Sequence, residues 1–203
     1  MNIFEEELLN YFGKEKLARI QSTHIGIAGL GGLGSNCACA LLRSGFCKFT
    51  LCDFDIVENK NLNRQFYFLD QVGLAKTQAL KANLLRINPD AELILVNKKI
   101  EKANAKAIFS ACDVIVEALD QAADKRMLAQ EFAGFAKLYV SASGLAGWGD
   151  SDALRTRKIG ERFYLIGDNT SETSSSLPPC APRVLIAAAK QADVVLAWAL
   201  KEG

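Results

Sequence analysis

A short run of glycines after an apolar segment constrains this chain more than any other feature. Gly29, Gly31 and Gly34 form G-x-G-x-x-G between the apolar residues 24–30 and the small, apolar residues 33–44. Such a turn has no β-carbons, exposes backbone amides and points a helix N-terminus at an anion. We expect a buried strand at 24–30, a helix at 33–44 and a phosphate-binding turn between them. The alternative is a glycine turn that serves only close packing of the helix.

The remaining pattern predicts an α/β fold in which strands and helices alternate. We expect strands at 48–53, 93–96, 113–118 and 138–142, and helices over the first twenty-odd residues and at 76–87, 103–110 and 122–132. After Gly144, residues 152–158 and 162–166 look like a hairpin, 169–176 like a polar loop, and 183–201 like a long helix. This order predicts a Rossmann-like, mainly parallel sheet with helices on both faces, a C-terminal antiparallel hairpin and a closing helix. We expect one domain over residues 1–203.

Composition excludes several classes of protein. Half of the 203 residues are apolar and 23% are charged, which is ordinary for a globular protein. The net charge of +1 predicts no nucleic-acid partner, and no apolar run reaches the eighteen residues of a membrane span. The acidic N-terminus, MNIFEEELLN, is unlike a secretory signal. The six cysteines form no C-x-x-C pair, so we expect free thiols, a cytoplasmic location and no structural zinc.

Charged residues beyond the turn favour a nucleoside triphosphate over a nicotinamide cofactor. Asp53 ends the second expected strand, where a carboxylate can accept hydrogen bonds from ribose hydroxyls. Arg64 offers a fork for phosphate oxygens, Lys76 a compact charge, and Asp120 a ligand for Mg²⁺. Asp120 is also placed to cap the helix that follows it. A nicotinamide-dependent oxidoreductase remains the alternative, since the glycine turn and Asp53 serve it equally well. The single histidine, His24, lies in a buried strand, where a general-base role is not expected.

These residues together resemble the ThiF/MoeB/HesA superfamily, which includes the adenylation domain of ubiquitin-activating enzymes. The resemblance rests on G-L-G-G-L-G at 29–34, D-F-D at 53–55, N-L-N-R-Q at 61–65, Lys76 and Asp120, and covers nearly the whole chain. The tail segments 156–160 and 181–183 also resemble the short ThiF-type branch, the sulfur-carrier adenylyltransferases of thiamine biosynthesis.

That resemblance implies an enzyme that uses ATP and Mg²⁺ to adenylylate the C-terminal glycine carboxylate of a small ubiquitin-fold sulfur carrier. The carrier would be ThiS-like, end in Gly-Gly and serve thiamine thiazole biosynthesis, and the reaction would release pyrophosphate. A homodimer is implied as well. The alternatives are an adenylyltransferase for a molybdopterin-type or other sulfur carrier and a relative that binds ATP without turnover.

The resemblance also assigns roles to individual residues. The nucleotide would contact Gly29, Gly31, Gly32, Gly34, Asp53, Asp55, Asn61, Arg64, Lys76 and Asp120. Asp53 would bind the ribose, Asn61, Arg64 and Lys76 the phosphates, and Asp120 the metal; Arg64, Lys76 and Asp120 would be catalytic. The alternative is that these side chains have only structural roles at a strand end, in a solvated loop or on an exposed helix. We expect Arg64 and Lys76 to be exposed cations whose removal leaves folding nearly unchanged.

The chain departs from the family pattern at three places. Gln121 follows Asp120 where the family commonly has asparagine. An N-terminal arginine that some members place in the partner subunit's site has no clear equivalent, and Lys14, Lys16 and Arg19 are equal candidates. Cys180 is the only positional candidate for a covalent link to the carrier, and we expect it to be a packed cysteine at the start of the last helix.

Overall fold

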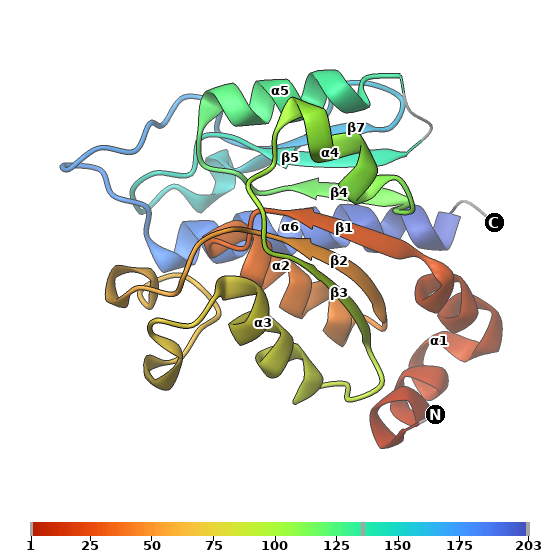
Figure 1. The fold of residues 1–203 in the computed structure, drawn as a ribbon. Coiled ribbons are helices and arrows are strands. Elements are labelled where there is room, and N and C mark those ends of the chain that lie inside the picture. The colour runs from red at the N-terminus through yellow and green to blue at the C-terminus, as the bar shows by residue number, and fades with distance from the viewer. Residues whose placement is uncertain (1, 135–136, 202–203) are drawn as a thin grey trace.

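Seven strands form one sheet in the computed structural model, which describes residues 2–134 and 137–201 (Figure 1). The strands are β1 (His24–Ala28), β2 (Lys48–Cys52), β3 (Glu92–Val96), β4 (Val114–Glu117), β5 (Leu138–Ala142), β6 (Arg155–Lys158) and β7 (Phe163–Gly167). Their order is β3-β2-β1-β4-β5-β7-β6, and every neighbouring pair is parallel except β6 and β7. The predicted mainly parallel sheet with an antiparallel C-terminal pair is confirmed.

Helices cover both faces of this sheet. They are α1 (Ile3–Ser22), α2 (Gly32–Arg43), α3 (Lys76–Leu85), α4 (Lys102–Phe109), α5 (Ala122–Phe132) and α6 (Ala181–Lys201), with short 3-10 helices at Asn59–Asn61, Leu69–Gln71 and Ser151–Ala153. Alternate residues of β4 show the two faces: Val114 and Val116 join the core beneath α2, α3 and α6, whereas Ile115 joins the core beneath α4 and α5.

Two elements differ in detail from the sequence prediction. The first helix is interrupted at Gly13, whose φ of 72° is left-handed. The expected hairpin strand at 152–158 begins with a 3-10 turn, so β6 starts only at Arg155. Strand β7 of the hairpin also pairs with β5, so the hairpin continues the main sheet. None of the helices in residues 2–134 and 137–201 is long and apolar enough to cross a membrane.

The carboxyl ends of the parallel strands bring the predicted site segments to one edge. β1 lies between β2 and β4, so the chain leaves β1 toward one side of the sheet and later returns on the other side. Ligands of open α/β sheets bind in the crevice at such a point. The segments that follow β1, β2, β4 and β5 all emerge at this edge, on the left of Figure 1, together with the start of α6.

Candidate functional site

Three glycines of the turn are required by close packing inside the protein. Gly29 has a φ of 91°, and a Cβ there would lie 2.8 Å from the carbonyl oxygen of Ala118. A Cβ on Gly34 would lie 1.8 Å from the carbonyl oxygen of Gly29. At Gly32 it would lie 2.8 Å from the side chain of Val184 on α6. These glycines let β1, α2, α6 and the residues after β4 approach one another.

Gly31 is different, because its missing side chain faces space. A Cβ there would be 3.8 Å from its nearest neighbour, Nε2 of Gln65, and the φ of −74° is open to other residues. Gly31 is also the N-cap of α2, and no described side chain caps that helix. The first amides of an α-helix have no partner within the helix. The turn therefore leaves room and backbone donors for an anion such as phosphate.

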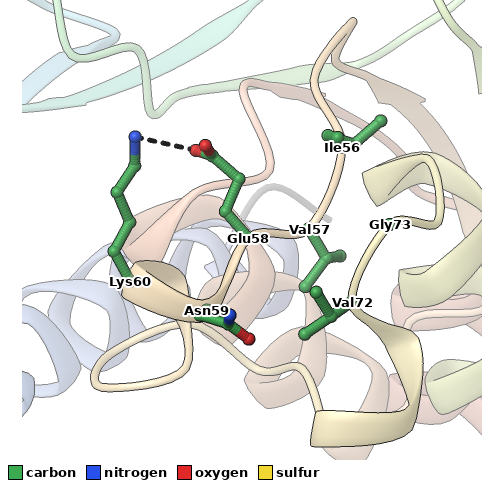
Figure 2. Close-up of a pocket in the computed structure, with 7 residues that line it drawn as sticks. All are labelled: Ile56, Val57, Glu58, Asn59, Lys60, Val72 and Gly73. Carbon is green, nitrogen blue, oxygen red and sulfur yellow. Dashed lines mark ion pairs between the residues drawn. The ribbon is translucent and has the colours of Figure 1, made fainter.

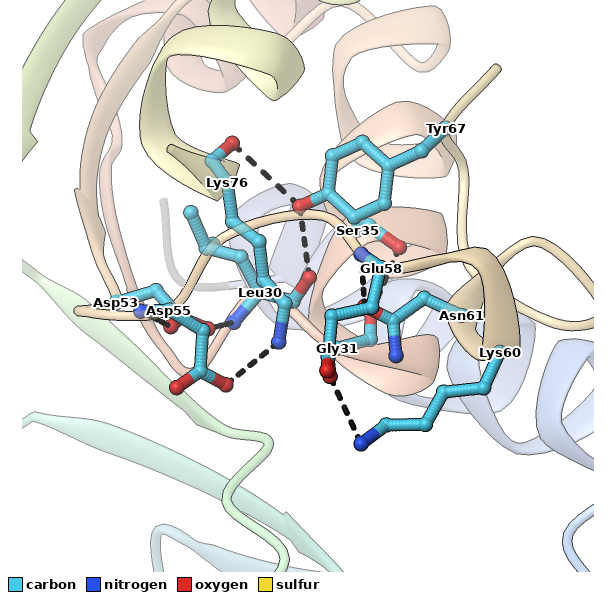
Figure 3. A network of polar contacts seen from close by, with 10 residues as sticks. All are labelled: Leu30, Gly31, Ser35, Asp53, Asp55, Glu58, Lys60, Asn61, Tyr67 and Lys76. Carbon is cyan, nitrogen blue, oxygen red and sulfur yellow. Dashed lines mark hydrogen bonds and ion pairs between the residues drawn. The ribbon is translucent and has the colours of Figure 1, made fainter. Parts of the chain in front are cut away.

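Asp53 holds the turn from the end of β2. Its Oδ2 accepts a hydrogen bond from the backbone N–H of Leu30 at 2.6 Å, and its Oδ1 accepts one from the N–H of Asp55 at 2.8 Å (Figure 3). The residue is only 8% exposed. Each carboxylate oxygen has a second lone pair, so a ribose hydroxyl can still be accepted. Asp53 thus has a structural role, and its contact with ribose stays a prediction.

Lys76 is buried, which corrects the expectation of an exposed cation. Residues 55–57 run beside residues 73–76: Ile56 pairs with Ala75, and the backbone N–H of Lys76 donates to the carbonyl of Asp55 at 2.9 Å. This pairing places the Lys76 ammonium 2.7 Å from Oδ2 of Asp55. The exposed fraction of the lysine side chain is 7% and that of the aspartate 48%. The two predicted nucleotide contacts therefore form an ion pair at the start of α3 (Figure 3).

Sequence reasoning missed Tyr67, which connects the turn to α3. Its hydroxyl donates to the carbonyl oxygen of Leu30 at 2.8 Å and lies 3.5 Å from that of Lys76 (Figure 3). Burial, with the negative charges of Asp53 and Asp55, raises the pKa of Tyr67, so its hydroxyl remains a donor. Its sequence signal was weak, because Tyr67 lies between Phe66 and Phe68 in one continuous aromatic run.

Hydrogen bonds of its backbone and its side chain hold Arg64 in place beside the glycine turn. Nδ2 of Asn36 on α2 donates to the carbonyls of Gly32 at 2.6 Å and Arg64 at 2.9 Å, so the loop is tied to the helix start. The Arg64 guanidinium donates to the carbonyl of Lys60 and to Oδ1 of Asn63, and the residue is half-buried. Asn36 was not predicted; a polar residue in a small-residue helix is its only sequence signal.

Asn61 is a buried residue of the same loop. Only 4% of it is exposed, and its Oδ1 accepts a hydrogen bond from the backbone N–H of Glu58 at 3.0 Å. Ser35 of α2 adds a second tie, donating to the carbonyl of Gly31 and accepting from the N–H of Phe66. The loop 58–66 is therefore fixed against the glycine turn before any ligand is considered.

Asp120 lies on the loop after β4, next to the turn. A Cβ on Gly29 would lie 3.3 Å from the Leu119 side chain, so this loop packs on the glycines. Asp120 is exposed and makes no hydrogen bond or ion pair with the described residues. The expectation that it caps the next helix is wrong, because Gln121 is the N-cap of α5 and caps with no side-chain bond to the described residues.

A magnesium ion would find one carboxylate here rather than a complete protein cage. The described residues contain no group of three or more His, Cys, Asp or Glu side chains placed to hold a metal. Mg²⁺ commonly uses one or two carboxylates, substrate phosphates and water. The exposed Asp120 beside the turn fits that pattern.

A pocket of about 430 Å³ opens beside this network (Figure 2). It is lined by Ile56, Val57, Glu58, Asn59, Lys60, Val72 and Gly73. Lys60 and Glu58 form an ion pair of 2.9 Å at its rim. The glycine turn, Asp53 and Lys76 do not line the pocket, so it is separate from the predicted phosphate site.

The remaining candidates lie on different elements. Lys14, Lys16 and Arg19 belong to α1, which precedes the amino end of β1, away from the glycine turn (Figure 1). They therefore do not join the site of their own chain. Cys180 immediately precedes α6, as expected, with its Sγ 3.6 Å from the carbonyl of Pro178, but it is half-buried rather than fully packed.

Arg183 fixes the loops that border the site on the side of β5 and β7. Its guanidinium donates to the carbonyls of Gly149 and Asp150, at 3.0 and 3.1 Å, and to Oδ2 of Asp168 at 2.5 Å. Burial alone would raise the pKa of Asp168. Hydrogen bonds from Ser171 and Thr170 and the charge of Arg183 outweigh that effect and lower it to about 2.

Solved structures share this fold. An Escherichia coli tRNA N6-threonylcarbamoyladenosine dehydratase in complex with AMP superposes with a TM-score of 0.86 at 20% identity, covering 96% of this chain and 93% of that one. The same enzyme in complex with ATP gives a TM-score of 0.84 at 20% identity, over 98% and 96% of the two chains.

Curated relatives match over shorter lengths. The chain is 32% identical over 139 residues to an adenylyltransferase and sulfurtransferase MOCS3 of Drosophila willistoni, covering 68% of this chain and 30% of the relative. It is 34% identical over 119 residues to the tRNA threonylcarbamoyladenosine dehydratase of Escherichia coli K12, covering 58% and 44%. The matched segment spans only about a third of the length of several of these relatives. The sequence profile of the ThiF family, by contrast, matches residues 5–188. Because that match takes in every segment that meets at the carboxyl edge of the sheet, the chain belongs to the ThiF family.

Proposed function

We propose that this chain uses ATP to adenylylate the C-terminal glycine carboxylate of a small ubiquitin-fold sulfur carrier and releases pyrophosphate. The observation that carries the proposal is the single edge at which an open glycine turn, the ion-paired Lys76, the loop of Arg64 and the exposed Asp120 come together. Membership of the ThiF family supports the same chemistry. For the carrier we propose a ThiS-like protein of thiamine thiazole synthesis, on the tail segments 156–160 and 181–183.

The residues suit a reaction that needs charge stabilisation rather than a base. A carboxylate is anionic near pH 7, so one of its oxygens can attack the α-phosphorus without losing a proton. The bond from the α-phosphorus to the bridging oxygen breaks, and pyrophosphate leaves with the electron pair. Arg64, Lys76 and the amides of the turn would bind the phosphate oxygens and reduce repulsion between the reacting anions. When bound at Asp120, Mg²⁺ would neutralise further phosphate charge.

The test is carrier-dependent exchange between ATP and labelled pyrophosphate. Purified carriers that end in Gly-Gly, one ThiS-like and one of the molybdopterin type, are compared with the same carriers lacking the last two residues. We expect exchange with the intact ThiS-like carrier and none with its truncated form. Exchange with the molybdopterin-type carrier alone would support adenylylation of a carrier but contradict the proposed thiamine pathway. No exchange with any carrier, although ATP binds, would contradict the proposed function.

The E. coli tRNA dehydratase supplies a second candidate, in which the activated substrate belongs to a tRNA. The observation in its favour is the 34% identity over 119 residues. A net charge of +1 does not favour a nucleic-acid partner. ATP consumption that depends on tRNA and not on a carrier would select this candidate.

A further inference from the structure

A fully buried carboxylate ends β4, three residues before Asp120. Glu117 is 0% exposed, and its two oxygens accept four hydrogen bonds. Oε1 accepts from the backbone N–H of Leu119 at 2.7 Å and from the Lys125 ammonium at 3.0 Å. Oε2 accepts from the hydroxyl of Ser141 at 2.5 Å and from the same ammonium at 3.2 Å. Both oxygens therefore have donors, and the Lys125 ammonium lies against the carboxyl group.

Lys125 is fully occupied in this arrangement. Besides the two oxygens of Glu117, its ammonium donates to the carbonyl of Ala142 at 2.9 Å. Three acceptors match the three protons of an ammonium group, which leaves no donor for a substrate. The lysine therefore acts inside the protein, joining the ends of β4 and β5 to the first turns of α5.

A second buried side chain supports the same strand ends. Nε2 of Gln191 on α6 donates to the backbone carbonyls of Glu117 at 3.1 Å and Val140 at 3.4 Å. The end of β4 is thus held by α5 through Lys125 and by α6 through Gln191. The loop that starts there has a fixed origin.

That loop carries both the packing contact with the turn and the free carboxylate. The N–H held by Glu117 belongs to Leu119, whose side chain packs on Gly29. The next residue is Asp120, whose exposed side chain makes no hydrogen bond or ion pair with the described residues. Its location relative to the turn is set by its backbone, which is tied at Leu119 by Glu117 and at Ala118 by the hydrogen bond that this residue's N–H donates to the carbonyl of Ala28 at 2.8 Å.

We propose that Glu117 is a positioning residue that holds Asp120 in place for the nucleotide and its metal, with Lys125 and Ser141 as its partners. The inference rests on the proposed function, which assigns Asp120 to Mg²⁺. Residues that orient a metal ligand commonly change metal affinity or activity by roughly 10- to 100-fold when they are replaced.

The test compares two variants of this cluster with a control from β2, outside the cluster. Glu117→Gln keeps the size of the side chain but turns one acceptor into a donor facing Ser141 or Leu119. Ser141→Ala keeps the charge and removes one bond, which provides a milder variant if Glu117→Gln folds poorly. Thr50→Val is the control, because its buried hydroxyl lies in the middle of β2 and bonds to His24, the first residue of β1.

Two readouts separate positioning from stability. Amide hydrogen exchange reports on residues 119–121, and the Mg²⁺ concentration for half-maximal thermal stabilisation by ATP reports on the metal. We expect Glu117→Gln to speed exchange of the Leu119 amide and to raise the half-maximal Mg²⁺ concentration roughly tenfold. Ser141→Ala should produce smaller increases in the Leu119 exchange rate and in the half-maximal Mg²⁺ concentration. Thr50→Val should change neither quantity.

If both cluster variants behave like Thr50→Val, Glu117 serves stability alone and the inference is wrong. Failure of the proposed function gives a different result. In that case the wild-type chain supports no carrier-dependent pyrophosphate exchange. The Glu117→Gln variant still differs from the wild type in ATP stabilisation and in amide exchange.

Discussion

The Lys76 ammonium lies 2.7 Å from the Asp55 carboxylate, with the lysine side chain 7% exposed and the aspartate side chain 48% exposed. Because the burial is unequal, loss of either partner has unequal consequences. Without Lys76, Asp55 is left facing water. Without Asp55, a buried ammonium loses its partner.

We therefore expect Asp55→Ala to destabilise the fold more than Lys76→Ala. Breaking a buried pair costs most when a buried charge is left behind, so we expect a loss of about 2–3 kcal/mol for Asp55→Ala and about 1 kcal/mol for Lys76→Ala. Urea denaturation of the two variants without nucleotide measures both values. Equal losses, or a larger loss for Lys76→Ala, would show that the aspartate is not needed to keep the lysine buried.

Substitutions at two glycines of the turn should separate effects on stability from effects on nucleotide binding. Gly31→Ala meets no atom closer than 3.8 Å, so the free energy of unfolding should change by less than about 1 kcal/mol. The added methyl would enter the open space beside the turn that we assign to phosphate, so ATP-dependent thermal stabilisation should fall strongly. Gly34→Ala is the contrast, since its Cβ would lie 1.8 Å from the Gly29 carbonyl oxygen, and we expect a loss of about 3 kcal/mol or more. If folded Gly31→Ala shows the same thermal stabilisation by ATP as the wild type, the phosphate does not bind at this turn.

Arg64→Ala should lower carrier-dependent pyrophosphate exchange by roughly 10²–10³, the effect of removing one charge-stabilising donor. The residue is half-buried, and its guanidinium contacts are exposed, so stability should change little. Lys60→Ala is the matched control, because this cation lies on the same loop and pairs with Glu58. In the Arg64→Ala/Asp120→Ala double variant, the fold-loss of exchange should be smaller than the product of the two single fold-losses, because both residues act on the same phosphates. Wild-type exchange in Arg64→Ala would exclude it from the site.

The sequence predicted the fold well because hydrophobic periodicity and turn composition are local properties. Residues 122–132 have the predicted bounds, and the G-x-G-x-x-G turn between strand and helix anticipated the sheet edge at which the site segments meet. Lys76 could not be placed correctly, since a lysine at the start of a polar helix looks exposed. Its burial depends on Asp55, twenty-one residues away, through the pairing of residues 55–57 with 73–76.

The buried supports of the site were missed for the same reason. Glu117 in the apolar segment DVIVEA was a signal that a partner must exist, but Lys125 and Ser141 are identified only once β4, α5 and β5 meet. The alternative role of Asp120 as an N-cap was wrong because a cap depends on backbone geometry at one residue, and the helix begins one residue later than that role requires.

Cys180→Ala should keep carrier-dependent pyrophosphate exchange near the wild-type rate. The thiol immediately precedes α6 with its sulfur toward the Pro178 carbonyl, and exchange requires only the adenylylation step. Cys39→Ala, another partly buried free cysteine, is the control for general effects of removing a thiol. Loss of exchange in Cys180→Ala alone, with ATP stabilisation retained, would assign this thiol a direct role.

Acid should weaken the link between α6 and the loops bordering the site. The pKa of Asp168 is lowered to about 2 in the folded chain, below its ordinary value near 4, so the ionised form favours folding. The stabilisation is complete above about pH 4 and is lost as the pH falls through about 2, a change of about 2 kcal/mol. Asp168→Asn removes this contribution, so the difference in unfolding free energy between wild type and variant should shrink from pH 5 to pH 2. Urea denaturation across that range measures it. A difference that stays constant with pH would show that the ionised form of Asp168 does not stabilise the fold through its contacts with Ser171, Thr170 and Arg183.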